Sequence, residues 1–175
     1  MSTSGHHPGT AHRGRVTDFD FLTGAWDVSH RRLRRRGVGS DDWDTFSSTS
    51  WCEPRLGGLA NVDQVDCPDR GFSGLTLRVF DPVAEQWSIW WVSSTVGRLE
   101  PPVTGGFDGT SGGGASGVFE GADTDGGRPV TVRFTWTVID EDHVRWQQAF
   151  TLDGLDGTHW ETNWIMDFSR RTVDR

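Results

Sequence analysis

Four polar residues of this 175-residue chain occupy segments that are expected to form strands around an apolar interior. If Trp26 points inward, His30 follows it inward by the period of two. Asn61 and Asp63 share one face of a later segment, and Arg78 stands between apolar neighbours. A few polar groups in an apolar wall are typical of a ligand pocket, and a histidine near a carboxylate can act as a general base. We therefore take all four as candidate ligand-binding residues. The alternative for His30 is a histidine near a rim, bonded to a carboxylate.

Aromatic side chains alternate along the segments expected to carry these groups. We expect three inward sets near the C-terminus: Val130, Val132, Phe134 and Trp136; Val144, Trp146, Gln148 and Phe150; and Trp160, Thr162, Trp164, Met166 and Phe168. Two earlier segments give Leu75, Leu77 and Val79, and Trp87, Ile89 and Trp91. Because a buried amide without a partner costs about 1–3 kcal/mol, Gln148 either bonds a neighbour or faces a ligand. Trp91, Trp146, Gln148, Thr162 and Trp164 complete the candidate ligand-binding set.

The elements that must position these side chains are strands, because the period is two and turn signals recur every eight to fifteen residues. We expect about nine or ten strands after a disordered tail at 1–16, with residues 17–175 forming one domain. The expected strands are 25–36, 41–51, 59–66, 71–82, 85–94, a short edge strand at 97–103, 128–139, 143–152 and 158–170. Residues 104–117 are glycine-rich and predict a mobile loop or wide hairpin. An antiparallel meander of this size can hide its edges in a closed up-and-down β-barrel, so the predicted fold is all-β; a two-sheet sandwich is the alternative.

Composition limits the partners. The formal net charge is −8, and all seventeen cationic residues are arginine. An acidic chain repels phosphate, so we expect neither nucleic acid nor a membrane surface as partner. There is no apolar run long enough for a membrane span or export signal, and Cys52 and Cys67 predict reduced thiols in the cytoplasm. No spacing suits zinc or a phosphate loop, so no metal or cofactor is expected. A homodimer is compatible with the sequence.

The arginine-rich run at 31–36 has two interpretations. It could bind an anion, or it could pair with the acidic residues that follow the turn at 37–40. In the second case Arg36 would face Asp41 and Arg35 would face Asp42, since cross-strand opposite charges stabilise a hairpin. We favour this pairing.

Gly24-Ala25-Trp26 matches the G-x-W signature of the calycin superfamily, to which the lipocalins belong. The longer pattern "FDFLTGAWDV", "LTLRVFDPVAEQWSIWWVSS", "VRWQQAFTLDG" and "HWETNWIMDFSR" resembles an uncharacterised bacterial lipocalin-like family of the DUF1579 type. The resemblance covers nearly all of the chain after residue 17. It implies a calycin-like barrel in which the tryptophan closes the floor and Arg170 or Arg171 packs across it. It implies no particular activity.

Three functions fit these observations. The first is a small-molecule-binding barrel that holds an apolar or aromatic ligand in a tryptophan-lined cavity. The second is a cofactor-independent isomerase, cyclase or dehydratase, with His30 and Asp63 as acid/base groups. The third is haem binding, because nitrobindins share an opening of the form F-L-x-G-x-W; this chain departs from them in its last strand, where His159 precedes Trp160.

Overall fold

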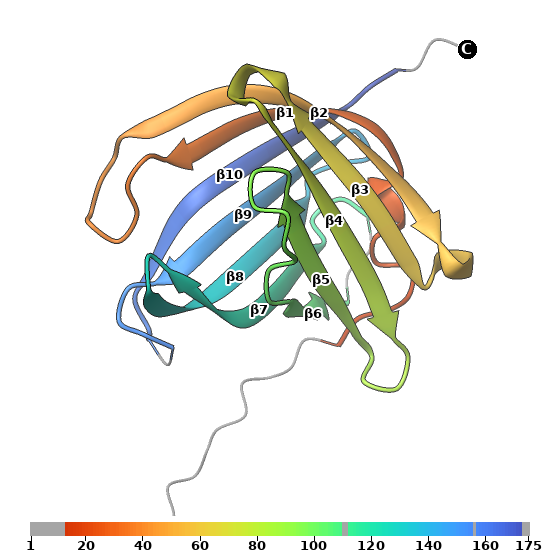
Figure 1. Cartoon of the computed structure of the whole chain (residues 1–175). Coiled ribbons are helices and arrows are strands. Elements are labelled where there is room, and N and C mark those ends of the chain that lie inside the picture. Colours follow the sequence, from red (N-terminus) through yellow and green to blue (C-terminus); the bar gives the residue numbers. More distant parts are fainter. Residues whose placement is uncertain (1–12, 110–111, 156, 173–175) are drawn as a thin grey trace, which may run out of the picture.

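The computed structural model describes residues 13–109, 112–155 and 157–172, and their strands form one closed antiparallel barrel (Figure 1). Its ten described strands are β1 (Gly24–Leu33), β2 (Trp43–Arg55), β3 (Ala60–Cys67), β4 (Phe72–Asp81), β5 (Gln86–Ser93), β6 (Val103–Phe107), β7 (Ser116–Asp125), β8 (Arg128–Val138), β9 (His143–Thr151) and β10 (Trp160–Arg170). Each strand pairs with its neighbours in sequence, and β1 also pairs with β10. The predicted all-β barrel is confirmed, and the sandwich alternative is wrong because this last pairing leaves the sheet without an edge.

Two strand predictions are wrong around the glycine-rich segment. Residues 97–102 are not a strand. β6 begins at Val103, the last residue of the expected edge strand, continues into the stretch predicted as a mobile loop or wide hairpin, and pairs there with β7. β7 was not predicted, since its glycines and acidic residues have low strand propensity. Gly121 in β7 is required by a close approach: a Cβ there would lie 2.3 Å from the carbonyl oxygen of Pro102.

The face of β4 that was expected to point inward is the wrong one. Thr76 and Arg78 are 7 % and 2 % exposed and point inward, whereas Leu75, Leu77 and Val79 face outward. The pairing agrees, because Thr76 lies opposite Trp91 and Arg78 opposite Ile89, both of which point inward. The alternation of β4 is present as predicted, but its polar half faces the interior, because this part of the wall borders the cavity.

A β-bulge changes the face of the first residues of β10. The register shifts between Thr162 and Trp164, so Thr162 pairs with Ala149 on the outer face. Trp160 also faces outward, where the guanidinium of Arg133 stacks 3.8 Å above its ring. The prediction that Trp160 and Thr162 point inward is therefore wrong. The bulged residue, Asn163, is 1 % exposed, and Trp164, Met166 and Phe168 point inward as predicted.

The segment before β1 closes one end of the barrel. The 3-10 helix η1 (Asp20–Leu22) and Phe19 fill this end, and Phe19 packs edge-on against Trp87, Phe107 and Trp136. Trp26 is fully buried, and its indole N–H donates to the carbonyl of Leu22 at 2.8 Å. The alternation that buries Trp26 thus also fixes Phe19 and η1, which together form the plug of the barrel.

The tail predicted at 1–16 is too long at its C-terminal end, while residues 1–12 lie outside the described residues. Gly14 is buried, and its N–H donates to the carbonyl of Glu85 at 2.6 Å. The carbonyl of Arg15 accepts the indole N–H of Trp87 at 3.0 Å. Gly106 permits this crossing, because a Cβ there would lie 2.5 Å from the nitrogen of Gly14.

Arg170 locks the closed end, as the resemblance implied for Arg170 or Arg171. Its guanidinium lies 4.2 Å from the centre of the Trp26 ring and donates to the carbonyls of Phe21 and Thr23 at 2.8 and 2.9 Å. Arg171 instead pairs with Asp27 at 3.2 Å on the surface.

The two cysteines, Cys52 and Cys67, are buried and form no disulfide bond. No helix among the described residues is long and apolar enough to cross a membrane.

We expect Arg170→Ala to lower the free energy of unfolding by about 2 kcal/mol, because it removes a cation–π contact, hydrogen bonds to the carbonyls of Phe21, Thr23 and Glu141, and a surface ion pair with Asp142. The matched change Arg171→Ala should cost less than about 1 kcal/mol, since it removes one exposed ion pair. Urea unfolding followed by tryptophan fluorescence measures both. Equal losses for the two variants would contradict this role of Arg170.

Candidate functional site

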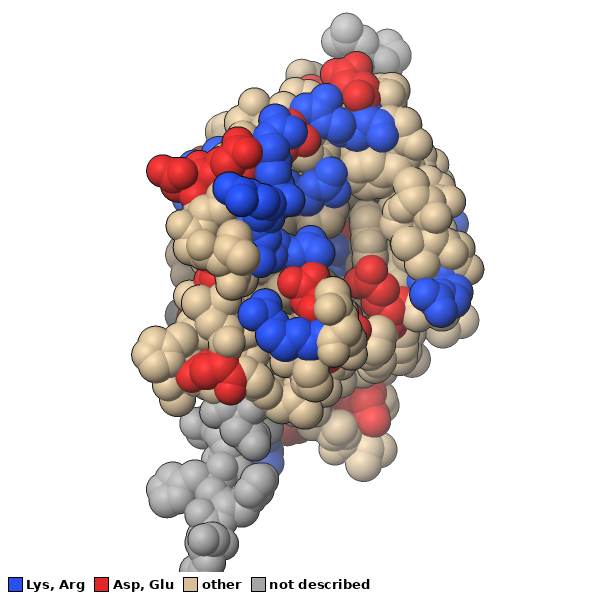
Figure 2. All heavy atoms as spheres, turned by 60° about the vertical axis from the view of Figure 1, so that its left-hand side comes forward, with Lys and Arg blue, Asp and Glu red and all other residues tan. Residues whose placement is uncertain are grey.

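A cavity of about 750 Å³ occupies the barrel between the plug and the open end. Figure 2 shows the side of the molecule that carries this opening, where arginines and carboxylates gather around a hollow. The lining runs from charged residues at the rim to aromatic residues deeper in the barrel. The fold therefore supplies one chamber, closed by residues 13–22 at one end and open at the other.

Three tryptophans form much of the aromatic wall. The rings of Trp91 and Trp146 each meet Trp164 edge to face, with centroids 6.3 and 5.7 Å apart. Gly74 makes room for Trp91, because a Cβ on this glycine would lie 1.7 Å from the tip of the indole. Phe134 packs against Trp146 at 4.9 Å. Aromatic rings that pack edge to face in this way form a rigid wall with flat apolar surfaces.

His30 lies inside the barrel but does not line the cavity. It is 1 % exposed, and its ring stacks on Phe46 with centroids 4.4 Å apart. The indole N–H of Trp164 donates to Nδ1 at 3.1 Å, so Nε2 carries the proton and donates to Ser48 at 2.7 Å. Burial, and next the charge of Arg32, lower the pKa of His30 from 6.5 to about 4. His30 is thus a neutral residue that orients the cavity-lining Trp164.

Asp63, Asn61 and Arg78 meet near the base of the cavity, whereas His30, the fourth member of the predicted polar cluster, bonds Ser48 and Trp164 instead. Arg78 contacts Asp63 at 2.5 Å and donates to the side-chain oxygen of Asn61 at 2.9 Å. Its guanidinium also lies over the rings of Phe19 and Trp136. Asp63 and Arg78 line the cavity, whereas Asn61 stands behind them and fixes the arginine.

Gln148 lines the cavity and has a partner. Its side-chain amide donates at 2.8 Å to the oxygen of Asn163, the residue that the β10 bulge turns inward. Both alternatives for Gln148 therefore hold in part, because the amide bonds a neighbour and still borders the cavity.

Charged residues at the open end are paired differently from the prediction. Arg36 reaches across the mouth to Asp125 at 2.7 Å, not to Asp41. Arg34, not Arg35, pairs with Asp42 at 3.4 Å and with Asp44 at 3.1 Å. β1 ends at Leu33 and β2 begins at Trp43, so the hairpin loop is longer than the predicted turn. The backbone N–H of Arg34 donates to the carbonyl of Asp42 at 3.0 Å, which places Arg34, and not Arg35, opposite Asp42.

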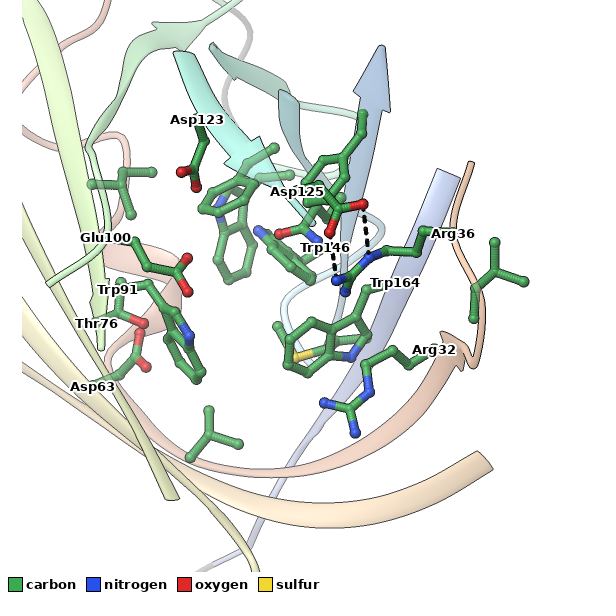
Figure 3. Close-up of a pocket in the computed structure, with 18 of the residues that line it drawn as sticks. Arg32, Arg36, Asp63, Thr76, Trp91, Glu100, Asp123, Asp125, Trp146 and Trp164 are labelled. Atoms are coloured by element: carbon green, nitrogen blue, oxygen red, sulfur yellow. Dashed lines mark hydrogen bonds and ion pairs between the residues drawn. The ribbon is translucent and has the colours of Figure 1, made fainter. Parts of the chain in front are cut away.

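Carboxylates and arginines face each other across the upper part of the cavity. Figure 3 shows Glu100 and Asp123 on one side and Arg32 and Arg36 on the other. Burial and the neighbouring Asp123 raise the pKa of Glu100. Among the described residues, no group of three or more histidine, cysteine or acidic side chains is arranged to hold a metal ion.

Six of the nine predicted site residues line the cavity: Asp63, Arg78, Trp91, Trp146, Gln148 and Trp164. His30 and Asn61 support the wall from behind, and Thr162 lies outside the barrel. The principal lining residues that the prediction left out are Arg32, Arg36, Thr76, Glu100, Asp123, Asp125, Phe134 and Phe150. Phe134 and Phe150 belong to the predicted inward sets of their strands, and Arg32 follows His30 inward by the same period of two, so alternation could have selected all three.

The fold and the site define this protein as a closed ten-stranded antiparallel barrel, as far as it is described, with one aromatic cavity and a charged mouth. No protein-family model matches the chain, and no curated protein matches it. Among solved structures it is similar to EF1p2_mFAP2b bound to DFHBI, with 13 % identity and a TM-score of 0.45 over 89 % of this chain and 98 % of the other. Membership of the DUF1579-type family, the cytoplasmic location and the homodimer stay predictions.

The neutral state of His30 predicts a pH-dependent stability. Between pH 6.5 and about 4 the unfolded chain protonates this residue while the folded chain does not. The free energy of unfolding therefore falls as the pH is lowered through this window. His30 alone contributes a loss of about 2 kcal/mol between pH 7 and pH 4.5.

Urea unfolding of the wild type and of His30→Gln at both pH values isolates this contribution from that of the carboxylates. Glutamine keeps a donor and an acceptor but does not titrate. We expect the variant to lose less stability on acidification than the wild type. The same loss in both proteins would refute a neutral buried His30.

Proposed function

We propose that this protein binds one small, largely apolar or aromatic molecule inside the barrel. The observation that carries the proposal is the cavity of about 750 Å³ whose wall includes Trp91, Trp146 and Trp164. Its size lies within the range of about 300–1,000 Å³ that is usual for small-molecule sites. Its wall combines eleven apolar side chains, the tryptophans among them, with twelve polar ones, so a ligand would find flat apolar surface and groups that can fix its orientation.

The wall is held in place before a ligand arrives. His30 fixes Trp164 by a hydrogen bond, Gly74 accommodates Trp91, and Phe134 packs on Trp146. A site whose side chains are already ordered loses less conformational entropy on binding, which favours affinity. Flat indole surfaces suit a planar ligand, because offset and edge-to-face contacts between rings add about 0.5–1.5 kcal/mol beyond area burial.

The acid/base and haem alternatives have less support. Both ring nitrogens of His30 are engaged, by Trp164 and Ser48, and the side chain is 1 % exposed, so a ligand could not reach it without rearrangement. Asp63, the second acid/base candidate, is occupied by Arg78. His159, at the start of the last strand, bonds Asp153 at the surface.

The adjacent residues Gln147 and Gln148 allow a matched test, because they point to opposite faces of β9. N-phenyl-1-naphthylamine, a neutral aromatic dye, should bind the wild type with a dissociation constant of about 1–10 μM and gain fluorescence. Gln148→Trp places an indole in the cavity and should weaken binding at least about tenfold, since the added ring takes up space beside the tryptophan wall.

Gln147→Trp adds the same ring on the outer face and should leave the affinity unchanged. Thermal melts establish that both variants fold. A dye that binds all three proteins equally does not occupy the cavity, and that result would overturn the proposal.

A further inference from the structure

The arginines that line the cavity differ in whether a carboxylate neutralises them. Arg34 lies 3.1 Å from Asp44, Arg36 lies 2.7 Å from Asp125, and Arg78 pairs with Asp63. The fourth lining arginine, Arg32, has no carboxylate within 4.0 Å among the described residues. The cavity wall therefore contains one cation whose counter-ion the described protein does not supply.

Asp44, the carboxylate that most influences Arg32, is bound to two other arginines. Asp44 accepts from Arg70 through both of its oxygens, at 3.0 and 2.6 Å, and from Arg34 at 3.1 Å. Arg36 and Arg70 add like charge near Arg32. Burial lowers the pKa of Arg32 as well. These features together favour an anion that would bind at this guanidinium.

The position of Arg32 combines this charge with aromatic surface. Its guanidinium lies 5.0 Å from the ring centre of Trp164, 5.1 Å from that of Phe46 and 5.5 Å from that of Phe72. The aromatic contacts hold the side chain without using a hydrogen-bond acceptor, so its N–H donors stay available. In Figure 3 it extends into the cavity beside Trp164.

Resting on the proposed function, we propose that the ligand is an aromatic carboxylic acid whose carboxylate binds Arg32 while its ring lies against the tryptophan wall. A planar guanidinium matches a carboxylate through two parallel hydrogen bonds. Glu100 and Asp123 face Arg32 from the other side of the cavity, so a ligand with a second anionic group would be repelled there. The ligand class is thus a planar aromatic monoanion.

Isothermal titration calorimetry with 2-naphthoate and with its neutral isostere 2-naphthamide tests this inference. The wild type should bind the acid about 10- to 100-fold more tightly than the amide, the range expected for a charge-assisted pair. Arg32→Gln should remove this preference, because the acid and the amide then meet the same neutral side chain. Arg32→Lys keeps the charge without the planar fork and should retain part of the preference.

Arg31→Gln is the matched control. Arg31 is the preceding residue of β1, is exposed on the outer face and loses the same charge on substitution, so the preference should persist. Equal affinities of the wild type for acid and amide, or a preference that survives in Arg32→Gln, would overturn the anion inference and leave the proposed function standing. Binding of neither compound to the wild type would overturn both. Equal affinities of the wild type for acid and amide overturn the inference even where Arg32→Gln does not fold, and Arg32→Lys then tests the arginine itself.

Discussion

The pairing of β1 with β10 is the constraint on which the rest of the structure depends. Seven consecutive residue pairs, from Trp26 opposite Arg170 to Arg32 opposite Trp164, join the two ends of the chain. Closure fixes which face of every strand is interior, because successive side chains alternate across a sheet. It also fixes the size of the lumen. A ring of ten strands is wider than the side chains of its wall can fill, so the chain must supply a plug or leave a cavity.

This protein does both, one at each end. At the closed end Phe19 and Leu22 fill the lumen, and Arg170 ties their segment to Trp26. No segment of the described chain fills the other end in the same way, and there the wall carries polar groups that water or a ligand can reach. The division explains why buried polar side chains such as Asp63 and Arg78 lie above the plug, where they can pair with each other and still border the cavity.

Alternation predicted most of the fold, and its failures have physical causes. The inward sets of β5, β8 and β9 were correct because an apolar face is buried there. On β4 the same rule gave the wrong face, since Thr76 and Arg78 face the cavity and apolar residues cover the outside. On β10 the bulge at Asn163 reverses the alternation, and a sequence pattern alone does not reveal one extra residue. The partners of the mouth arginines were equally out of reach, because the bond from Arg36 to Asp125 joins segments 89 residues apart.

His30 and Arg32 show how the same strand can separate support from recognition. Both point inward on β1 and both contact Trp164, but His30 is closed off by two hydrogen bonds and the ring of Phe46. A histidine in that state is neutral at physiological pH, so it adds no charge to the cavity while it fixes an indole at the edge of it. Arg32, two residues nearer the mouth, remains charged, is held by aromatic rings and lacks a carboxylate partner among the described residues. His30, which the sequence suggested as an acid/base group, therefore orients the wall, and Arg32, two residues further along β1, is the proposed recognition group.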